Sequence, residues 1–463
     1  MAERVPVAGR AAGLSQSLSL LDATTLVMGS MIGSGIFIVP ADIARQVDSP
    51  ALLMAVWLVT ALMTWMAALC YGELASALPQ AGGQYVYLRE AFGPLCGFLY
   101  GWTLFLVIQT GTIAAVAVAF AKFAGVWFPA ISASHKLLPF LSTQQLTAIG
   151  VLIVLTAVNT RQVKTGALVQ NIFTAAKTTA LGALIVAGFS FGRNPAAVES
   201  NFGDFWRGAE WSWDVVRVVG VAMVGALFSS DAWNNVTFTA AEVQNPRRTV
   251  PRALVLGVTA VSVLYLLCNL SYLQMLTLEE IKTAPEDRVA TQAVLRFLGP
   301  AGALAVAAAI MISTFGCVNG MVLAGARAYY AMAEDGLFFR RAAELHPVQR
   351  TPVVSLMVQC AWACLLTLTG AYSDLLDYVI FAVLLFYMLT IAALFRLRRT
   401  RPNLERYYRA AGYPLVPALY IALAALISIL LLRYKPTYTW PGLLIVLLGV
   451  PVYFLWRKRG NTV

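Results

Sequence analysis

The chain has 463 residues, of which 33 are Lys or Arg and 22 are Asp or Glu, giving a formal net charge of +11. Charged residues make up only 12% of the chain and hydrophobic residues 59%, so polar residues are too few to cover a surface exposed to water. This composition argues against a soluble enzyme, a nucleic-acid-binding domain and a disordered scaffold. It indicates a protein whose main solvent is a lipid bilayer.

Apolar segments recur along the chain at lengths that suit a transmembrane helix, which needs about 20 residues. Ten segments contain no charged residue: 23–41, 49–72, 91–121, 137–160, 253–278, 297–326, 351–373, 378–395, 413–432 and 438–456. Two more, at about 166–190 and 215–241, are interrupted by ionisable residues. The sequence therefore predicts an all-α polytopic membrane protein with 12 transmembrane helices, since helices satisfy their own backbone groups in lipid.

The distribution of Lys and Arg predicts the orientation, because cytoplasmic loops carry an excess of both. With the N-terminus in the cytoplasm, 20 of the 33 basic residues lie on the cytoplasmic side and ten on the other side. The remaining three, Lys177, Arg217 and Arg327, lie within spans. Both termini are therefore predicted to be cytoplasmic, and no signal peptide is recognised before the first span.

The first span contains Gly29, Ser30, Gly33, Ser34 and Gly35 near its middle. Glycine costs about 1 kcal/mol relative to alanine inside a helix, so this pattern favours either unwinding or a close approach to another helix. Unwound backbone at membrane depth is tolerated where it lines a cavity or is buried by protein. The free N–H groups and the start of the following half-helix would suit a carboxylate.

The sixth span is interrupted at Phe228, Ser229, Ser230 and Asp231. Interrupted segments at corresponding positions of two halves predict the binding site of a transporter. The first and sixth spans are five helices apart, and this odd number gives the two halves inverted topology. Backbone carbonyls released at residues 228–230 could accept hydrogen bonds from an ammonium group. A carboxylate site on one broken helix and an ammonium site on the other predict an α-amino acid as the substrate.

The predicted organisation has four parts and no soluble domain. They are a cytoplasmic tail at 1–19, a first five-helix repeat at 20–192, a second inverted repeat at 193–400, and a C-terminal part at 401–463 with helices 11 and 12.

Five ionisable residues in or near spans need an explanation, because a charge within a bilayer is costly. One of them, Arg217, begins the sixth span and is expected to reach the outer headgroups. Lys177 could replace a bound sodium ion by bridging carbonyl and hydroxyl groups of the first and fifth spans, or could exchange a proton, and snorkelling to the interface is the structural alternative. Asp231 could hold a substrate's side chain or ammonium, exchange a proton, or bind helix ends left open by the break. Glu73 and Arg327, near cytoplasmic ends of spans, are predicted to form structural or gating salt bridges.

The six cysteines all lie in or beside apolar stretches and are interpreted as small buried hydrophobic residues: Cys70, Cys96, Cys268, Cys317, Cys360 and Cys364. The two histidines, His135 and His346, fall in predicted loops. The sequence predicts no metal site, cofactor or catalytic pair.

Several segments resemble the amino acid–polyamine–organocation superfamily, and especially its L-type amino acid transporter branch. These segments are GSMIGSGIF (29–37), YGEL (71–74), PQAGGQY (79–85), AAEVQNPRR (240–248), FGCVNG (315–320) and GYP (412–414). The resemblance covers about residues 18–430 and looks bacterial. It implies an inverted five-plus-five helix fold with two additional C-terminal helices, and alternating access around a site at the middle of the membrane.

The resemblance also implies roles for single residues. Ser34 and Gly35 match positions that contribute to carboxylate binding, and Met31 and Phe228 match positions at the ammonium group and gate. Lys177 matches a lysine that stands in for sodium in sodium-independent members. With Ile36 and Ser229 added, the expected substrate-binding residues are Met31, Ser34, Gly35, Ile36, Phe228, Ser229 and Asp231.

Asp231 departs from the pattern of many relatives that carry large neutral amino acids, which have glycine at this position. Some relatives for cationic or small polar amino acids carry aspartate there, so large neutral specificity is not expected.

Animal members join a glycoprotein heavy chain through a cysteine between helices three and four. The loop at 122–145 contains no cysteine, so no disulfide-linked heavy chain is expected.

The sequence therefore predicts a sodium-independent amino acid transporter of the bacterial inner membrane, acting as an exchanger of neutral or small polar amino acids. The alternatives are a proton-coupled or cationic amino acid transporter, and an amino-acid-binding membrane sensor that does not transport.

Overall fold

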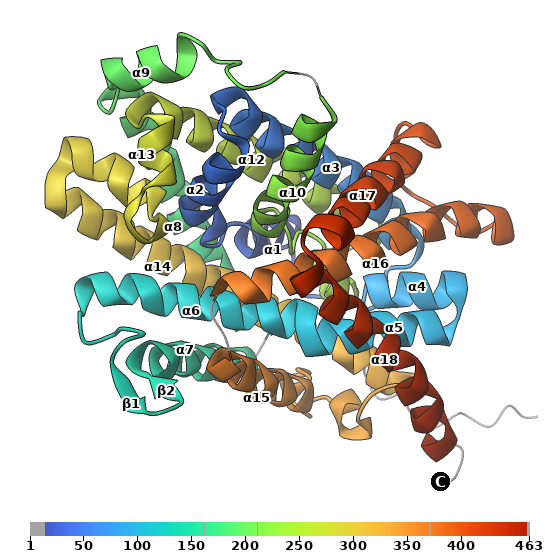
Figure 1. Ribbon diagram of the computed structural model, residues 1–463. Helices are drawn as coiled ribbons and strands as arrows, with labels where there is room; N and C mark the ends of the chain where they lie inside the picture. The colour runs from blue at the N-terminus through green and yellow to red at the C-terminus, as the bar shows by residue number, and fades with distance from the viewer. Residues whose placement is uncertain (1–13, 162, 211, 370–371, 461–463) are drawn as a thin grey trace, which may run out of the picture.

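The computed structural model describes residues 14–161, 163–210, 212–369 and 372–460 (Figure 1). Within these ranges the only strands are β1 (Lys136–Leu138) and β2 (Leu141–Ser142), which pair antiparallel as a short hairpin. All the other regular elements that the structure describes are helical, as the sequence predicted.

The first half of the described chain contains these helices: α1 (Leu20–Met31), α2 (Gly35–Val47), α3 (Pro50–Ala77), α4 (Gln84–Phe92), α5 (Pro94–Thr103), the π-helical turn η1 (Leu104–Ile108), α6 (Gln109–Trp127), α7 (Thr143–Asn159), α8 (Val163–Ser190), α9 (Pro195–Phe202) and α10 (Trp213–Ser229). The second half contains α11 (Asn235–Phe238), η2 (Ala240–Glu242), α12 (Pro246–Met275), α13 (Leu278–Lys282), η3 (Pro285–Asp287), α14 (Val289–Glu334), η4 (Arg340–Ala343), α15 (Val353–Thr369), α16 (Tyr372–Thr400), α17 (Leu415–Tyr434) and α18 (Pro436–Gly460).

The twelve predicted spans all correspond to helical segments in the described part of the chain. Nine segments there are long and apolar enough to cross a membrane, two of them being the α1–α2 pair and the α5–η1–α6 run. The shorter apolar helices Thr143–Asn159 and Val353–Leu368 and the broken α10–α11 segment account for the other three. The prediction of an all-α polytopic membrane protein is confirmed.

One predicted span begins later than expected. The charge-free segment starts at 137, but the structure places the β1–β2 hairpin there and starts α7 at Thr143. The Ser142 hydroxyl accepts a hydrogen bond from the Gln145 N–H, and the Gln145 side chain accepts one from the Ser142 N–H at 2.8 Å. This reciprocal capping fixes the helix start inside the apolar stretch, because it satisfies two backbone donors.

The burial pattern of α8 is the one expected in a bilayer. Leu168, Ile172 and Val186 are each more than half exposed on its outer side. The polar side chains of Thr174 and Lys177 are buried on the inner side. Apolar groups therefore face the surroundings and polar groups face other helices, which indicates lipid as the solvent on the outer side.

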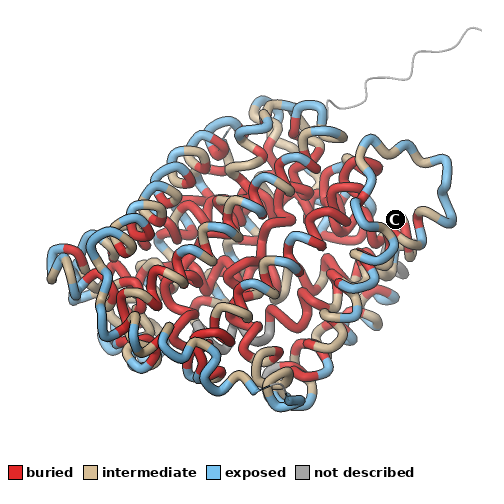
Figure 2. The backbone as a smooth tube through the Cα atoms, turned by 90° about the horizontal axis from the view of Figure 1, so that it is seen from above, coloured by how far each residue is buried: buried red, intermediate tan, exposed pale blue. Residues whose placement is uncertain are grey.

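The two halves of the first span lie at the centre of the helical assembly. α1 packs on α8, α12 and α14, while α2 packs on α10 (Figure 1). α6 lies beside α7, α14 and α15. In Figure 2 the buried backbone runs through the interior and the exposed residues gather at the periphery. Both breaks in the helices therefore lie among other helices.

Candidate functional site

The first break separates α1 from α2 at residues 32–34. Ile32 has an extended backbone, with φ −74° and ψ 94°, and α2 begins at Gly35. Because the helix stops here, carbonyl groups at the end of α1 lose their partners within the helix. The Ile32 N–H still bonds to the Met28 carbonyl, which ends α1 with a regular turn.

The glycines around this break also allow close packing, so both consequences considered from the sequence occur together. A Cβ atom on Gly35 would lie 2.1 Å from Ser229 Oγ and 3.0 Å from Ser229 Cα. A Cβ atom on Gly29 would lie 1.9 Å from Gln170 Nε2. Glycine at position 35 therefore lets α2 approach the end of α10, and glycine at position 29 lets α1 approach α8.

The second break separates α10 from α11 at residues 230–234. The Ser230 N–H completes α10 by bonding to the Ala226 carbonyl, and Ala232 then adopts a positive φ of 61°. An L-residue rarely takes this left-handed conformation, so the chain direction changes sharply there. The breaks predicted in the first and sixth spans are thus both present.

Tyr265 of α12 connects the two breaks. Its hydroxyl oxygen lies 3.0 Å from the Met31 carbonyl oxygen and 3.1 Å from the Ser229 carbonyl oxygen. The single hydroxyl proton bonds to one of these two acceptors at a time. Tyr265 was not predicted, because it lies within the charge-free segment 253–278, which carries no break.

Lys177 of α8 binds the carbonyl groups at the first break. Its ammonium nitrogen donates to the carbonyl oxygens of Gly29 at 2.5 Å, Ile32 at 2.7 Å and Ser313 at 3.2 Å. The Ser313 hydroxyl lies 3.1 Å from the Ile32 carbonyl oxygen and 3.0 Å from that of Gly33. The ammonium group therefore links α1, α8 and α14, and at 1% exposed the residue does not snorkel to the interface.

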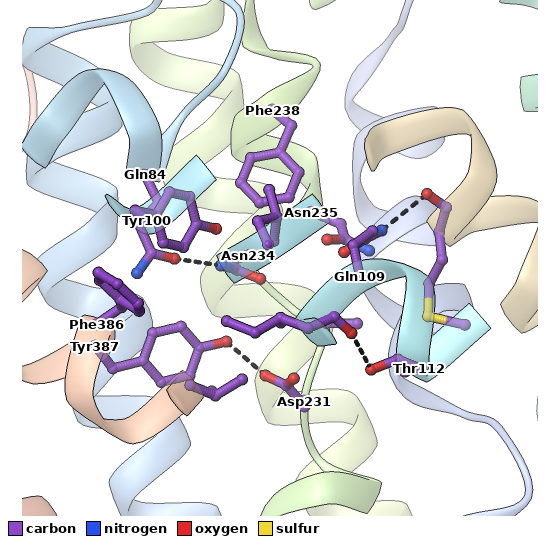
Figure 3. Close-up of a pocket in the computed structure, with 15 residues that line it drawn as sticks. Gln84, Tyr100, Gln109, Thr112, Asp231, Asn234, Asn235, Phe238, Phe386 and Tyr387 are labelled. Atoms are coloured by element: carbon purple, nitrogen blue, oxygen red, sulfur yellow. Dashed lines mark hydrogen bonds between the residues drawn. The ribbon is translucent and has the colours of Figure 1, made fainter. Parts of the chain in front are cut away.

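Asp231 is buried at the second break and bonds to a tyrosine from α16. The Tyr387 hydroxyl donates to Asp231 Oδ1 at 2.5 Å (Figure 3). Two small cavities adjoin this carboxylate, each of about 20 Å³ and therefore large enough for roughly one water molecule. One of them extends toward α6 and the other toward Thr64 of α3 and Tyr420 of α17.

The cavity toward α6 is lined by amide side chains (Figure 3). Asn234 Nδ2 donates to Gln84 Oε1 at 2.9 Å, and Gln109 Nε2 donates to the Met321 carbonyl at 2.8 Å. The amide nitrogens of Gln84 and Asn235 are buried and have no hydrogen-bond partner among the described residues. The cavity thus offers hydrogen-bond donors opposite the Asp231 carboxylate, and these amides were not predicted.

The predicted substrate-binding residues fall into two groups. Met31, Gly35 and Ser229 come together where α1, α2 and α10 meet, and Ser34, Ile36 and Phe228 are buried next to them in the chain. Asp231 forms the second group. It lines both small cavities, whereas Ser34, Gly35 and Ile36 line neither of them.

The predicted salt bridges of Glu73 and Arg327 are present. Arg327 Nε donates to the Glu242 carboxylate at 2.9 Å, and both side chains are almost fully buried. Arg398 donates two hydrogen bonds to the Glu73 carboxylate, at 2.8 and 2.5 Å, and Arg406 lies 3.2 Å from it. Glu242 follows α11, so its ion pair ties the second broken helix to α14.

Comparison with known proteins identifies the family. A model of the amino acid permease family matches residues 18–453. The chain belongs to this family. It is 30% identical over 456 residues to the serine/threonine exchanger SteT of Bacillus subtilis (strain 168), covering 96% of this chain and 98% of the relative.

Animal proteins are similar over comparable lengths. The chain is 31% identical to the human large neutral amino acids transporter small subunit 2 over 472 residues, which covers 98% of this chain and 84% of the relative. It is 29% identical to the mouse b(0,+)-type amino acid transporter 1 over 453 residues, which covers 96% of this chain and 88% of the relative. The superfamily predicted from the motifs is confirmed, and with it amino acid transport as the function.

Proposed function

We propose that the chain exchanges neutral or small polar L-amino acids across a bacterial inner membrane without sodium, by alternating access to a site between the two breaks. The observation that carries the proposal is the Lys177 ammonium bonded to three carbonyl groups at the end of α1. An ammonium group tethered there would hold the carbonyls as a bound sodium ion would, so transport would need no sodium. The exchanger SteT, a relative over nearly its full length, supports exchange and a small polar substrate.

The substrate's α-carboxylate would bind at the start of α2, where the N–H groups after Ser34 and Gly35 carry the positive end of a helix. Its ammonium would bind carbonyls at the end of α10, at Phe228 and Ser229. Met31 and Ile36 would lie beside the backbone of the substrate. We assign the side chain of the substrate to the space next to Asp231, where a carboxylate and unpaired amide donors suit a hydroxyl group.

Purified chain in proteoliposomes tests this proposal. Vesicles preloaded with serine or alanine should take up labelled serine in sodium-free buffer, and vesicles without internal amino acid should take up far less. Adding sodium should leave the rate unchanged. Absence of uptake across a panel of 20 amino acids, with folded protein in the vesicles, would refute transport.

A second candidate function is proton-coupled or cationic amino acid transport, which the buried Asp231 carboxylate favours. An imposed pH gradient across vesicles that contain no amino acid would drive uptake in a symporter and would not do so in an exchanger. In a cationic carrier, Asp231→Asn would weaken arginine and lysine transport selectively. A sensor would bind labelled amino acid with no flux in the same vesicles.

We further propose that the chain divides at 1–19, 20–192, 193–400 and 401–463, with both termini in the cytoplasm. In intact cells, epitope tags at either end should resist added protease. They should be digested only after the membrane has been opened. We also propose that the chain works without a disulfide-linked heavy chain. Its loop at 122–145 lacks cysteine and the described cysteines are free thiols, so it should run as a monomer on non-reducing gels.

A further inference from the structure

We propose that Asn171 and Asp22 form a latch that holds the cytoplasmic end of α1 against α8, and that this latch sets how often the transport site opens to the cytoplasm. The inference rests on the proposed function in that it assigns a role within a transport cycle. The contact itself is independent of which amino acid is carried. Neither residue touches the proposed substrate site, so both are positioning residues.

The two carboxylate oxygens of Asp22 have separate tasks. Oδ2 accepts hydrogen bonds from the Ser19 N–H at 2.8 Å and the Ser19 hydroxyl at 2.7 Å, which begins α1 with a capping box. Oδ1 accepts a hydrogen bond from Asn171 Nδ2 at 2.6 Å. One side chain thus starts the helix and ties its first turn to α8. A short bond of this kind, with a charged acceptor, is among the stronger hydrogen bonds.

Further polar contacts continue along the same face of α8. The Thr25 hydroxyl donates to the side-chain carbonyl of Asn171, and the Thr174 hydroxyl lies 3.2 Å from the Thr25 carbonyl oxygen. Positions 171, 174 and 177 are spaced by three residues, so they lie on one side of a helix. The outer side of α8 is apolar at Leu168 and Ile172. The row from Asn171 to Lys177 therefore joins α1 and α8 through hydrogen bonds.

The two ends of this row differ in their mechanical effect. Lys177 binds at the break, where α1 would pivot, and it also holds α14. Asp22 lies ten residues before Ile32, about 15 Å along the helix at 1.5 Å per residue. The end of a lever that is farthest from the pivot moves most, so the contact between Asn171 and Asp22 must break when the cytoplasmic half of α1 tilts away.

The chain just before α1 is bound as well. The N–H groups of Ser17 and Leu18 donate to the Glu242 carbonyl at 2.8 and 2.9 Å, and Gln244 N–H donates to the Leu18 carbonyl. The start of α1 and the end of the sixth span are therefore joined by backbone hydrogen bonds. Asn171 belongs to α8, which this backbone pairing does not include. Its bond to Asp22 is therefore one that opening must break.

Native Cys317 of α14 can report this opening. Its thiol lies 3.0 Å from the Ser30 carbonyl oxygen and the residue is 3% exposed, so α1 covers it in the closed form. The experiment measures labelling of Cys317 by a membrane-impermeant methanethiosulfonate reagent from the cytoplasmic side of oriented vesicles. Peptide mass spectrometry separates this thiol from the other cysteines.

Asn171→Asp is the test variant, because it places two carboxylates in contact and repels α1 from α8. We expect labelling of Cys317 at least about tenfold faster than in the wild type. The apparent KM for external substrate should rise, since fewer molecules face outward, while kcat changes less. Asn171→Asp combined with Asp22→Asn restores a donor and an acceptor with their places exchanged, and should return labelling and KM toward wild-type values.

Asn194→Asp is the matched control, because Asn194 caps α9 away from α1 and aspartate caps equally well. It should leave labelling unchanged. Asn171→Ala is a second test variant, which removes the hydrogen bond without adding a charge. Size-exclusion chromatography compares the folded fraction of every variant. Wild-type labelling rates in folded Asn171→Asp and Asn171→Ala, or failure of the exchanged pair to restore them, would overturn the latch. Faster labelling in a chain that transports nothing would support the latch and refute the proposed function.

Discussion

The ammonium nitrogen of Lys177 lies 2.5 Å from the carbonyl oxygen of Gly29, three residues before Ile32, where the first helix is broken. This contact joins a charge on one helix to backbone acceptors that another helix has released. Removal of the charge should therefore affect the break more than the fold as a whole.

Lys177→Met should reduce the rate of exchange at least about tenfold, because three buried carbonyl groups lose their donor while the side chain keeps a similar length. Lys136→Met is the control, since Lys136 is exposed in the β1–β2 hairpin. Labelled serine uptake into preloaded vesicles measures both variants. Wild-type uptake by Lys177→Met would contradict the role of the ammonium group.

Tyr265→Phe should lower exchange several-fold, because the hydroxyl that bonds to carbonyls at both breaks is lost. Tyr272→Phe on the same helix is the comparison, because the Tyr272 hydroxyl is also buried but forms no hydrogen bond to either break. Initial rates at saturating and limiting substrate separate an effect on turnover from one on binding. Equal rates for the two variants would show that the link between the breaks has no part in transport.

Asp231→Asn should weaken transport of serine more than that of alanine. The reason is that a carboxylate accepts a hydrogen bond from a substrate hydroxyl more strongly than an amide does. Competition by unlabelled serine and alanine against one labelled substrate gives the ratio of their affinities. Asp214→Asn, at the exposed start of α10, should leave this ratio unchanged. An unchanged ratio in Asp231→Asn would place the substrate side chain elsewhere.

Gly35→Ala should abolish exchange, because the added Cβ would lie 3.0 Å from the backbone Cα of Ser229, which cannot move aside as a flexible side chain does. Gly182→Ala is the control, since no atom lies within 4 Å of the position of its Cβ. Uptake and the thermal midpoint in detergent are measured for both. Exchange at the wild-type rate by Gly35→Ala would mean that α2 does not approach α10 this closely.

Glu242→Gln should lower the free energy of unfolding by about 3–5 kcal/mol, because it leaves the buried Arg327 guanidinium without its counter-charge. Asp287→Asn, which removes one of two acidic partners of Arg45 in a pair with both side chains about 40% exposed, should cost less than about 1 kcal/mol. Denaturation in detergent micelles compares the two. Similar losses would indicate that the Glu242 pair is hydrated.

Much of the fold was predictable from local patterns. A span needs only a run of apolar residues, so the apolar windows located the helices, and polar residues within two of them located the breaks. The start of α7 was misplaced because residues 137–140 are apolar, yet a capping box at Ser142 begins the helix later. A cap depends on two side chains three residues apart, which a hydropathy window does not weigh.

The sequence by itself determined that the chain is a helical membrane protein with two interrupted spans and a lysine within the fifth. Each of these features costs free energy in lipid at its own position, whatever its neighbours are. Only the tertiary structure decided which groups meet: the hydroxyl of Tyr265 with both breaks, and Asn171 with Asp22 across 149 positions of sequence. A polar side chain within a span indicates that its face meets other protein, but not which residue of which helix it meets, so these contacts depend on how the helices pack.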